Sequence, residues 1–265
     1  MNTKRGSLGY AIKNEDRDSL KKGPDAGTVL RSYRKRKKVP RNLVGKPFSV
    51  VNCLDQVAQG ACQGHALALI FSICYFLEFG QVLDFSRAAA YYLSQEYDGL
   101  LGRDVGSTLS AGRKVARAGL CLEADWPYPS GYQPQRPASA TPDKFIYKLL
   151  AATEFEKTED GFQLMMDWIR EGLPVQTGIF WNNSTDAEVI KRYMWSQNDG
   201  GHSTVLWLFD SYGNVNNNNS WGDDWCQDGT HTWLESALRE AFFVESNVFV
   251  GYAPDDLDVP NPEVV

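Results

Sequence analysis

Three residues of this chain have the types and the order that nucleophilic catalysis by a thiol requires. Cys62 follows a short polar turn and stands just before the apolar segment 66–79, whose composition predicts a buried helix. Backbone N–H groups in the first turn of a helix favour a thiolate, so this position suits an activated cysteine. His202 lies 140 residues further on and Asn219 lies 157 residues further on, and they would serve as the base and as its orienter. The chemistry indicated is acyl transfer through a thioester.

Two further positions would complete such a site. Gln56, six residues before Cys62, carries a side-chain amide, and we expect this amide and the Cys62 backbone N–H to stabilise an oxyanion. Trp221 comes two residues after Asn219, where its ring would keep water away from the hydrogen bond that the asparagine makes to the base. The glycine that precedes the histidine, Gly201, allows a close approach of the backbone at this point.

The other histidines and cysteines indicate no second site. His65 forms a Cys-x-x-His motif with the candidate nucleophile, but no second half of a zinc site follows, so we expect a structural role. His231 lies in a strand-like Thr-His-Thr segment and is predicted to be on the surface. The five cysteines form no C-x-x-C pair, so neither a disulfide framework nor a zinc ribbon is indicated, and we expect no metal or cofactor. Whether Cys53 pairs with Cys226 stays open.

The elements that must position these residues change in type along the chain. The first half is helical, because apolar spacing and capping residues predict helices at 62–79, 86–97 and 109–118. Five prolines between Pro127 and Pro142 predict an irregular linker. After a helix at 161–171, short strands are predicted at 175–180, 203–209, 213–218, 230–234 and 247–252. This order favours an α+β fold with the cysteine in the helical half and the histidine in the β half.

Charge divides the chain into a basic arm and an acidic body. Residues 1–46 hold 14 Lys and Arg against 4 Asp and Glu, whereas residues 47–265 hold 13 against 29. The arm, with its basic cluster 34–38, is predicted either to be solvated and partly disordered or to fold back in cis on the acidic body. An acidic body repels phosphate, so we expect no nucleic-acid partner, although salt-sensitive binding by the arm alone stays open.

No targeting or membrane segment is recognisable. The first ten residues carry charges without an apolar core, so no signal peptide is predicted. No uninterrupted apolar run of about 18 residues is present, so no transmembrane helix is expected. We therefore expect a protein that is cytoplasmic or exported by a non-classical route, and we expect a monomer.

Taken together, the motifs resemble the papain family of cysteine proteases, closest to its compact bacterial members. The resemblance covers roughly residues 40–253 and is specific because the motifs occur in the family's order and spacing. It is carried by Asp55-Gln56, Gly60-Ala61-Cys62, Gly201-His202 and Asn219-Ser220-Trp221-Gly222, with weaker matches at Trp126-Pro127-Tyr128, Leu173-Pro174-Val175 and Trp225. The chain departs from the family at Val57, Gln59, Gln63 and Cys226, where the family usually has Gly, Cys, Trp and Gly.

The resemblance implies a two-lobe α+β fold with the active-site cleft between the lobes. The left lobe, about 60–130, would be helical, and the right lobe, about 135–253 plus 43–55, would be antiparallel and β-barrel-like. It implies a thiol protease of the zymogen type, a cysteine endopeptidase that binds extended peptides at Gly106, Gly201 and Trp221. Residues 1–40 would be an inhibitory pro-segment, 41–253 the peptidase domain and 254–265 an acidic tail.

Two other activities on the same framework stay open. The first is a Cys–His acyltransferase or deamidase, but such enzymes usually orient the histidine with Asp, so Asn219 favours the peptidase. The second is a catalytically silent peptide-binding protein, for which a defective set of catalytic residues would be expected. The sequence keeps Cys62, His202 and Asn219, so hydrolysis of peptides is the leading prediction.

Overall fold

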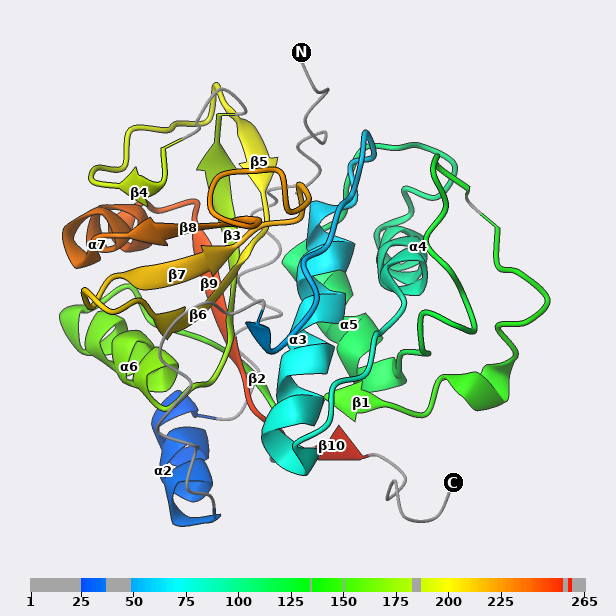
Figure 1. Cartoon of the computed structure of the whole chain (residues 1–265), viewed down its shortest axis with the longest axis horizontal. Coiled ribbons are helices and arrows are strands. Elements are labelled where there is room, and N and C mark those ends of the chain that lie inside the picture. The colour runs from blue at the N-terminus through cyan, green and yellow to red at the C-terminus, as the bar shows by residue number, and fades with distance from the viewer. Residues whose placement is uncertain are drawn as a thin grey trace.

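The computed structural model shows a helical lobe packed against a sheet-containing lobe (Figure 1). The structure describes residues 25–36, 49–133, 135–149, 151–182, 187–254 and 257–258. The helical lobe is built from α3 (Cys62–Phe79), α4 (Arg87–Asp98) and α5 (Leu109–Ala118). The proline-rich segment that follows is irregular in its described residues, until the short 3-10 helix η2 (Pro142–Lys144). The α+β class predicted from the sequence is confirmed.

Helix α3 is the core of the helical lobe. It is long and apolar enough to cross a membrane by length and composition, but 78% of it is buried inside the protein. It ends at Gly80, whose φ of 69° is the left-handed conformation common after a helix. Its neighbours α4 and α5 begin at Ser86 and Thr108, whose hydroxyls accept backbone N–H bonds from Ala89 and Ala111. These local caps explain why the three helices were predicted with nearly correct bounds.

The second lobe is organised around one mixed sheet, in the order β2-β9-β3-β6-β7-β8-β4. All its pairs are antiparallel except β4 with β8, and β5 pairs with one end of β3. The outermost strands β2 and β4 are not paired with each other, so the sheet is not closed into a barrel. The strands are β2 (Ala152–Glu154), β3 (Val175–Trp181), β4 (Val189–Ile190), β5 (Gly200–His202), β6 (Val205–Phe209), β7 (Val215–Asn218), β8 (Thr230–Trp233) and β9 (Val248–Tyr252).

Two helices accompany the sheet. Helix α6 (Glu159–Arg170) is amphipathic, and its apolar face, including Phe162 and Trp168, packs against β3 and β6. Helix α7 (Glu235–Phe243) follows β8 and was not predicted from the sequence. It begins after Leu234, which makes no side-chain cap, so the local signal for a helix start is absent.

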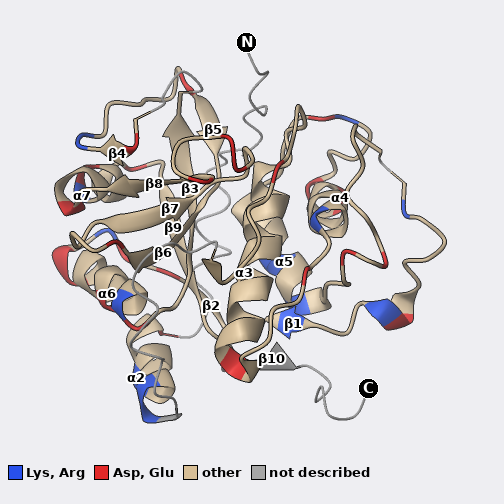
Figure 2. Ribbon diagram, in the orientation of Figure 1, with Lys and Arg blue, Asp and Glu red and all other residues tan. Residues whose placement is uncertain are grey.

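Part of the basic arm folds back on the acidic body. Helix α2 (Ala26–Arg36) packs against α6, at the end of the molecule opposite β5 (Figures 1 and 2). Arg34 lies 2.7 Å from Glu171 and 3.7 Å from Asp167, as opposite charge predicts. The contact also buries apolar side chains of α2, namely Ala26, Val29, Leu30 and Tyr33. The predictions for residues 1–24 and 37–40 lie outside the described residues.

The C-terminal tail also has some structure. Residues Leu257–Asp258 form β10, which pairs antiparallel with β1 (Lys148–Leu149), although the sequence predicts a loose tail. The rest of the tail after Pro254 lies outside the described residues.

Candidate active site

Cys62 is the first residue of α3, as predicted. Its side chain is 0% exposed, and the residue before it, Ala61, provides no side-chain cap. The start of a helix favours negative charge, because the positive end of the helix dipole lies there. The turn leading to the cysteine is held on the helical lobe, because the Gly60 N–H donates to Asp104 at 2.8 Å.

His202 and Asn219 are brought together by the sheet. His202 ends β5 and Asn219 follows β7, and both strands reach the same place because β3 pairs with β5 and β6 while β6 pairs with β7. The His202 Nε2 atom lies 2.8 Å from Asn219 Oδ1, which is a hydrogen bond. The ring of Trp221 stacks on the imidazole with centroids 4.9 Å apart. His202, Asn219 and Trp221 therefore lie together in the structure.

The electrostatic environment of His202 is dominated by burial. The imidazole is 0% exposed, and burial lowers its pKa to about 4, while the hydrogen bond to Asn219 acts in the opposite direction. In this fully covered site the neutral imidazole is favoured at neutral pH. Exposure of the site would remove the burial that lowers the pKa and leave the Asn219 bond, which favours the imidazolium.

Gln56 is attached to the β lobe rather than to the helix that follows it. Its Oε1 accepts a hydrogen bond from Ser220 at 2.6 Å, and its backbone N–H donates to the Ser220 carbonyl at 2.8 Å. Its Nε2 donates to the Gln59 carbonyl at 2.7 Å. Ser220 belongs to the motif around Asn219, but no role was predicted for it from the sequence.

Val57 keeps the turn of this loop in a glycine-like conformation. Its φ is 54°, in the left-handed region, where the papain family usually has glycine. A β-branched residue in this conformation costs roughly 1–2 kcal/mol. The loop that carries the oxyanion donor is therefore locally strained.

The glycines predicted to contact substrate have different environments. Gly106 has φ of 84°, its N–H donates to Tyr91 Oη at 3.2 Å, and its carbonyl accepts from Gln95 at 3.2 Å. Both polar groups of this backbone unit are therefore bonded inside the helical lobe. Gly201 lies in β5 opposite Phe180 of β3, and it is partly exposed.

His65 has the environment of a structural residue. It is 0% exposed, and its two ring nitrogens face the carbonyl oxygens of Ala61 at 3.0 Å and Asp55 at 3.2 Å. Burial, with a smaller effect of the Arg87 charge, lowers its pKa to about 3. Its ring also meets Tyr128 edge-on, 4.5 Å between centroids. The contacts join both ends of the loop that carries Gln56.

The prediction that His231 lies on the surface is wrong. The side chain is 0% exposed, and its Nε2 accepts a hydrogen bond from Trp233 Nε1 at 2.7 Å. Rings of Trp181 and Trp225 pack on it at 5.1 and 5.0 Å. Burial and the nearby His202 lower its pKa to about 3. The local sequence of a strand that looks polar could not reveal this, because Trp181, one of the residues that cover it, comes from a distant segment.

All five cysteines lie in the described part of the chain, and all are thiols. Cys53 and Cys226, whose pairing the sequence leaves open, are therefore not joined in this structure. Burial, followed by the Asp223 charge, raises the pKa of Cys53 to about 12, and burial raises the pKa of Cys74. Neither environment resembles that of an activated nucleophile.

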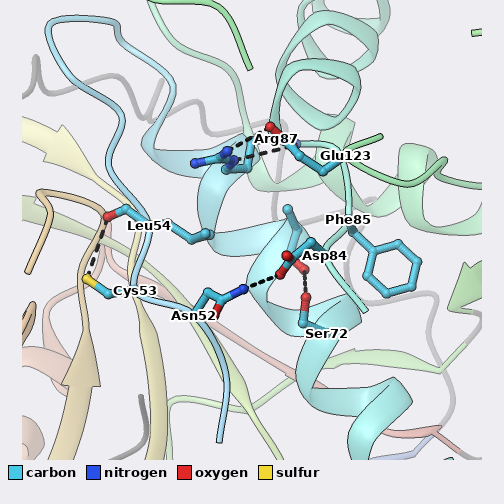
Figure 3. Close-up of a pocket in the computed structure, with 9 residues that line it drawn as sticks. Asn52, Cys53, Leu54, Ser72, Asp84, Phe85, Arg87 and Glu123 are labelled. Atoms are coloured by element: carbon cyan, nitrogen blue, oxygen red, sulfur yellow. Dashed lines mark hydrogen bonds and ion pairs between the residues drawn. The ribbon is translucent and has the colours of Figure 1, made fainter. Parts of the chain in front are cut away.

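A cavity of about 120 Å³ lies beside α3, and Ser72 of this helix is among its lining residues (Figure 3). The charged side chains that line it are bonded to other lining residues: Arg87 lies 2.7 Å from Glu123, and Asn52 donates to Asp84 at 2.6 Å. None of the predicted catalytic residues lines it. This cavity is therefore separate from the candidate active site.

Comparison with known proteins gives matches in structure alone. No protein-family model matches the chain, and no curated protein matches it by sequence. Xylellain, a cysteine protease from Xylella fastidiosa, matches with a TM-score of 0.69 and 21% identity, over 96% of this chain and 98% of its own. Digestive procathepsin L 3 of Tenebrio molitor matches with a TM-score of 0.61 and 14% identity, over 93% of this chain and 76% of its own. Procathepsin B S9 from Trypanosoma congolense matches with a TM-score of 0.59 and 18% identity, over 91% and 89%.

The fold is therefore that of the papain-like cysteine proteases. Two of the three structures named above are proenzymes. Because the identities are 14–21%, the likeness concerns the fold, and the chemistry of this chain is argued from its own residues.

Proposed function

We propose that this chain is a cysteine endopeptidase that uses Cys62, His202 and Asn219. The observation that carries the proposal is the 2.8 Å bond between His202 Nε2 and Asn219 Oδ1, in the lobe that packs against the helix beginning at Cys62. An orienting asparagine supports the peptidase over a deamidase or transglutaminase, which usually has Asp at this place. The fold of cysteine proteases adds support.

The proposed reaction proceeds through a thioester. His202 takes the proton of the Cys62 thiol, and the thiolate attacks the carbonyl carbon of the peptide bond. The oxyanion is stabilised by hydrogen bonds from the Gln56 side-chain amide and from the Cys62 N–H. His202 gives its proton to the leaving amine as the C–N bond breaks. Water, deprotonated by His202, then hydrolyses the thioester and releases the new carboxyl group.

The same residues support the proposal that the full chain is latent. Cys62 and His202 are both 0% exposed, so a substrate carbonyl needs the site to open before attack. Helix α2 anchors the basic arm on α6 through Arg34 and an apolar face. Residues 1–40 then act as an inhibitory segment that is held in cis, and the net charge of residues 1–46, +10, is opposite in sign to that of residues 47–265, −16.

The test of the activity is labelling with a thiol-reactive epoxide peptide mimic together with cleavage of a casein-like substrate. Cys62→Ala should abolish both. Cys74→Ala is the matched control, because Cys74 is buried in the same helix and has no catalytic partner assigned. The peptidase proposal fails if the wild type, with or without its arm, cleaves no better than Cys62→Ala.

The test of latency uses two truncations. Removal of residues 1–24 keeps α2, whereas removal of 1–40 takes α2 away with the apolar contact it makes. Each truncation should cleave a peptide faster than the full chain if the arm inhibits. Unchanged or lower rates in folded truncations, checked by circular dichroism, would count against autoinhibition.

A further inference from the structure

We infer that Gln176 is a positioning residue that fixes the nucleophile against its base across the two lobes. The inference rests on the function proposed above. Gln176 lies in β3 and is 0% exposed. Its Nε2 donates to the backbone carbonyl of Gln63 at 3.3 Å and to the hydroxyl of Ser203 at 3.2 Å. Gln63 directly follows Cys62 and Ser203 directly follows His202, so one amide spans both catalytic positions.

The orientation of this amide is fixed by its partners. A backbone carbonyl only accepts hydrogen bonds, so the Gln176 atom that faces Gln63 is the NH₂ group. The other end, Oε1, accepts from the Tyr252 hydroxyl at 3.1 Å. Tyr252 is 0% exposed and Ser203 is 1% exposed. A buried amide that makes three hydrogen bonds is held in one orientation, and breaking any of these bonds is costly.

The helical side of the bridge is equally constrained. The Gln63 side chain accepts a hydrogen bond from the Ser107 hydroxyl at 2.8 Å. It also lies over Gly112 of α5, where an added Cβ would come 1.8 Å from Gln63 Nε2. The residue after the nucleophile is therefore wedged between α5 and the β lobe. The family usually has tryptophan at this position, so the contacts of the Gln63 side chain with Ser107 and Gly112 belong to this chain's own sequence.

The chemistry explains why such a bridge matters. The nucleophile and the base come from different lobes, and proton transfer between them requires hydrogen-bond distance. A misplacement of about 1 Å can lower a rate by about 10²-fold. Gln176 acts on this distance without touching substrate or the reacting atoms.

The test compares Gln176→Met with Thr177→Val in the full chain. Methionine is similar in size but has no N–H donors. Thr177 is the next residue of β3, and its hydroxyl bonds Thr204 at 2.8 Å, so its replacement removes a buried bond that stays within the β lobe. The first readout is the rate at which iodoacetamide alkylates Cys62 between pH 5.5 and 9, followed by mass spectrometry of the peptide that contains it. A thiol coupled to a histidine reacts well below the ordinary cysteine pKa of about 8.5.

The second readout is kcat and KM for peptide cleavage, in the form of the wild type that is active. Gln176→Met should slow alkylation at pH 6 by about tenfold and lower kcat by about 10- to 10²-fold with little change in KM, whereas Thr177→Val should match the wild type. Equal behaviour of the two variants overturns the inference. If Gln176→Met does not fold, Ser203→Ala is used instead, because it removes one of the two hydrogen bonds that the Gln176 NH₂ group donates. The pH profile of Cys62 alkylation should then shift in the same direction, but by less. An unchanged profile overturns the inference.

The alkylation comparison also separates the two proposals. A wild type that cleaves peptides no better than Cys62→Ala refutes the proposed function, yet the pH dependence of Cys62 alkylation still shows whether Gln176 couples the thiol to His202.

Discussion

Acidification should destabilise this protein steeply, because its three histidines are buried as neutral imidazoles. Burial lowers the pKa of His65 and His231 to about 3 and that of His202 to about 4. In the unfolded chain an imidazole has a pKa of about 6.5. Below pH 6.5 the unfolded state therefore binds protons that the folded state does not bind, so the free energy of unfolding falls as the pH falls.

The magnitude follows from the number of groups. Each histidine contributes a slope of about 1.4 kcal/mol per pH unit between its unfolded and folded pKa values. Three histidines give roughly 4 kcal/mol per pH unit, or a loss of about 6 kcal/mol between pH 6.5 and pH 5. A typical domain is stable by about 5–15 kcal/mol, so much of the stability is lost in this window.

The assay is urea unfolding followed by tryptophan fluorescence at pH 8, 7, 6 and 5.5. Stability should change little between pH 8 and 7 and then fall. His231→Gln removes one titrating group and should reduce the slope by about 1.4 kcal/mol per pH unit, whatever its effect at pH 7. Tyr212→Phe, at a side chain that is 88% exposed, is the control with an unchanged slope. Equal stability at pH 7 and 5.5, or an unchanged slope in His231→Gln, would refute the reasoning.

Three substitutions test other parts of the structure. Gln56→Ala should lower kcat/KM for peptide cleavage by about 10²-fold or more, and an unchanged value would remove it from the oxyanion site. Gly64→Ala should lower the free energy of unfolding in urea by about 1–3 kcal/mol, because the new Cβ would lie 2.7 Å from the backbone of α4. Gly131→Ala is the control, because its Cβ would enter open space and should change the stability little. Tyr33→Ala, at a side chain that is 1% exposed, should lower the free energy of unfolding by about 3 kcal/mol, whereas Arg34→Ala should lower it by less than about 1 kcal/mol. The reverse order would show that charge, and not apolar burial, holds α2.

The features that could be predicted from the sequence are those that depend on neighbouring residues. The start of α4 follows from the Ser86 hydroxyl, and the end of α3 from Gly80, because caps act within one turn. The partnership of His202 with Asn219 was also predictable, because their motifs and the strand between them are close in the sequence.

The features that were missed depend on contacts between distant segments. His231 is covered in part by Trp181, which comes from β3, a strand distant in the sequence. The charge of the arm predicted that it is either solvated or folds back on the body, but helix α2 and its apolar contact with α6 were not predicted. The bridge made by Gln176 joins residues 113 and 27 positions away, so only the folded chain brings its partners together.

The place of β9 in the sheet also has a consequence for the nascent chain. This strand is made late, yet it lies inside the sheet, paired with β2 on one side and β3 on the other. Cys62 leaves the ribosome long before His202, and the sheet that orients the histidine stays incomplete until residue 252 has been synthesised. On the proposed function, ribosome-bound intermediates thus carry a thiol without its base, and proteolytic competence arises only when translation of the body is finished.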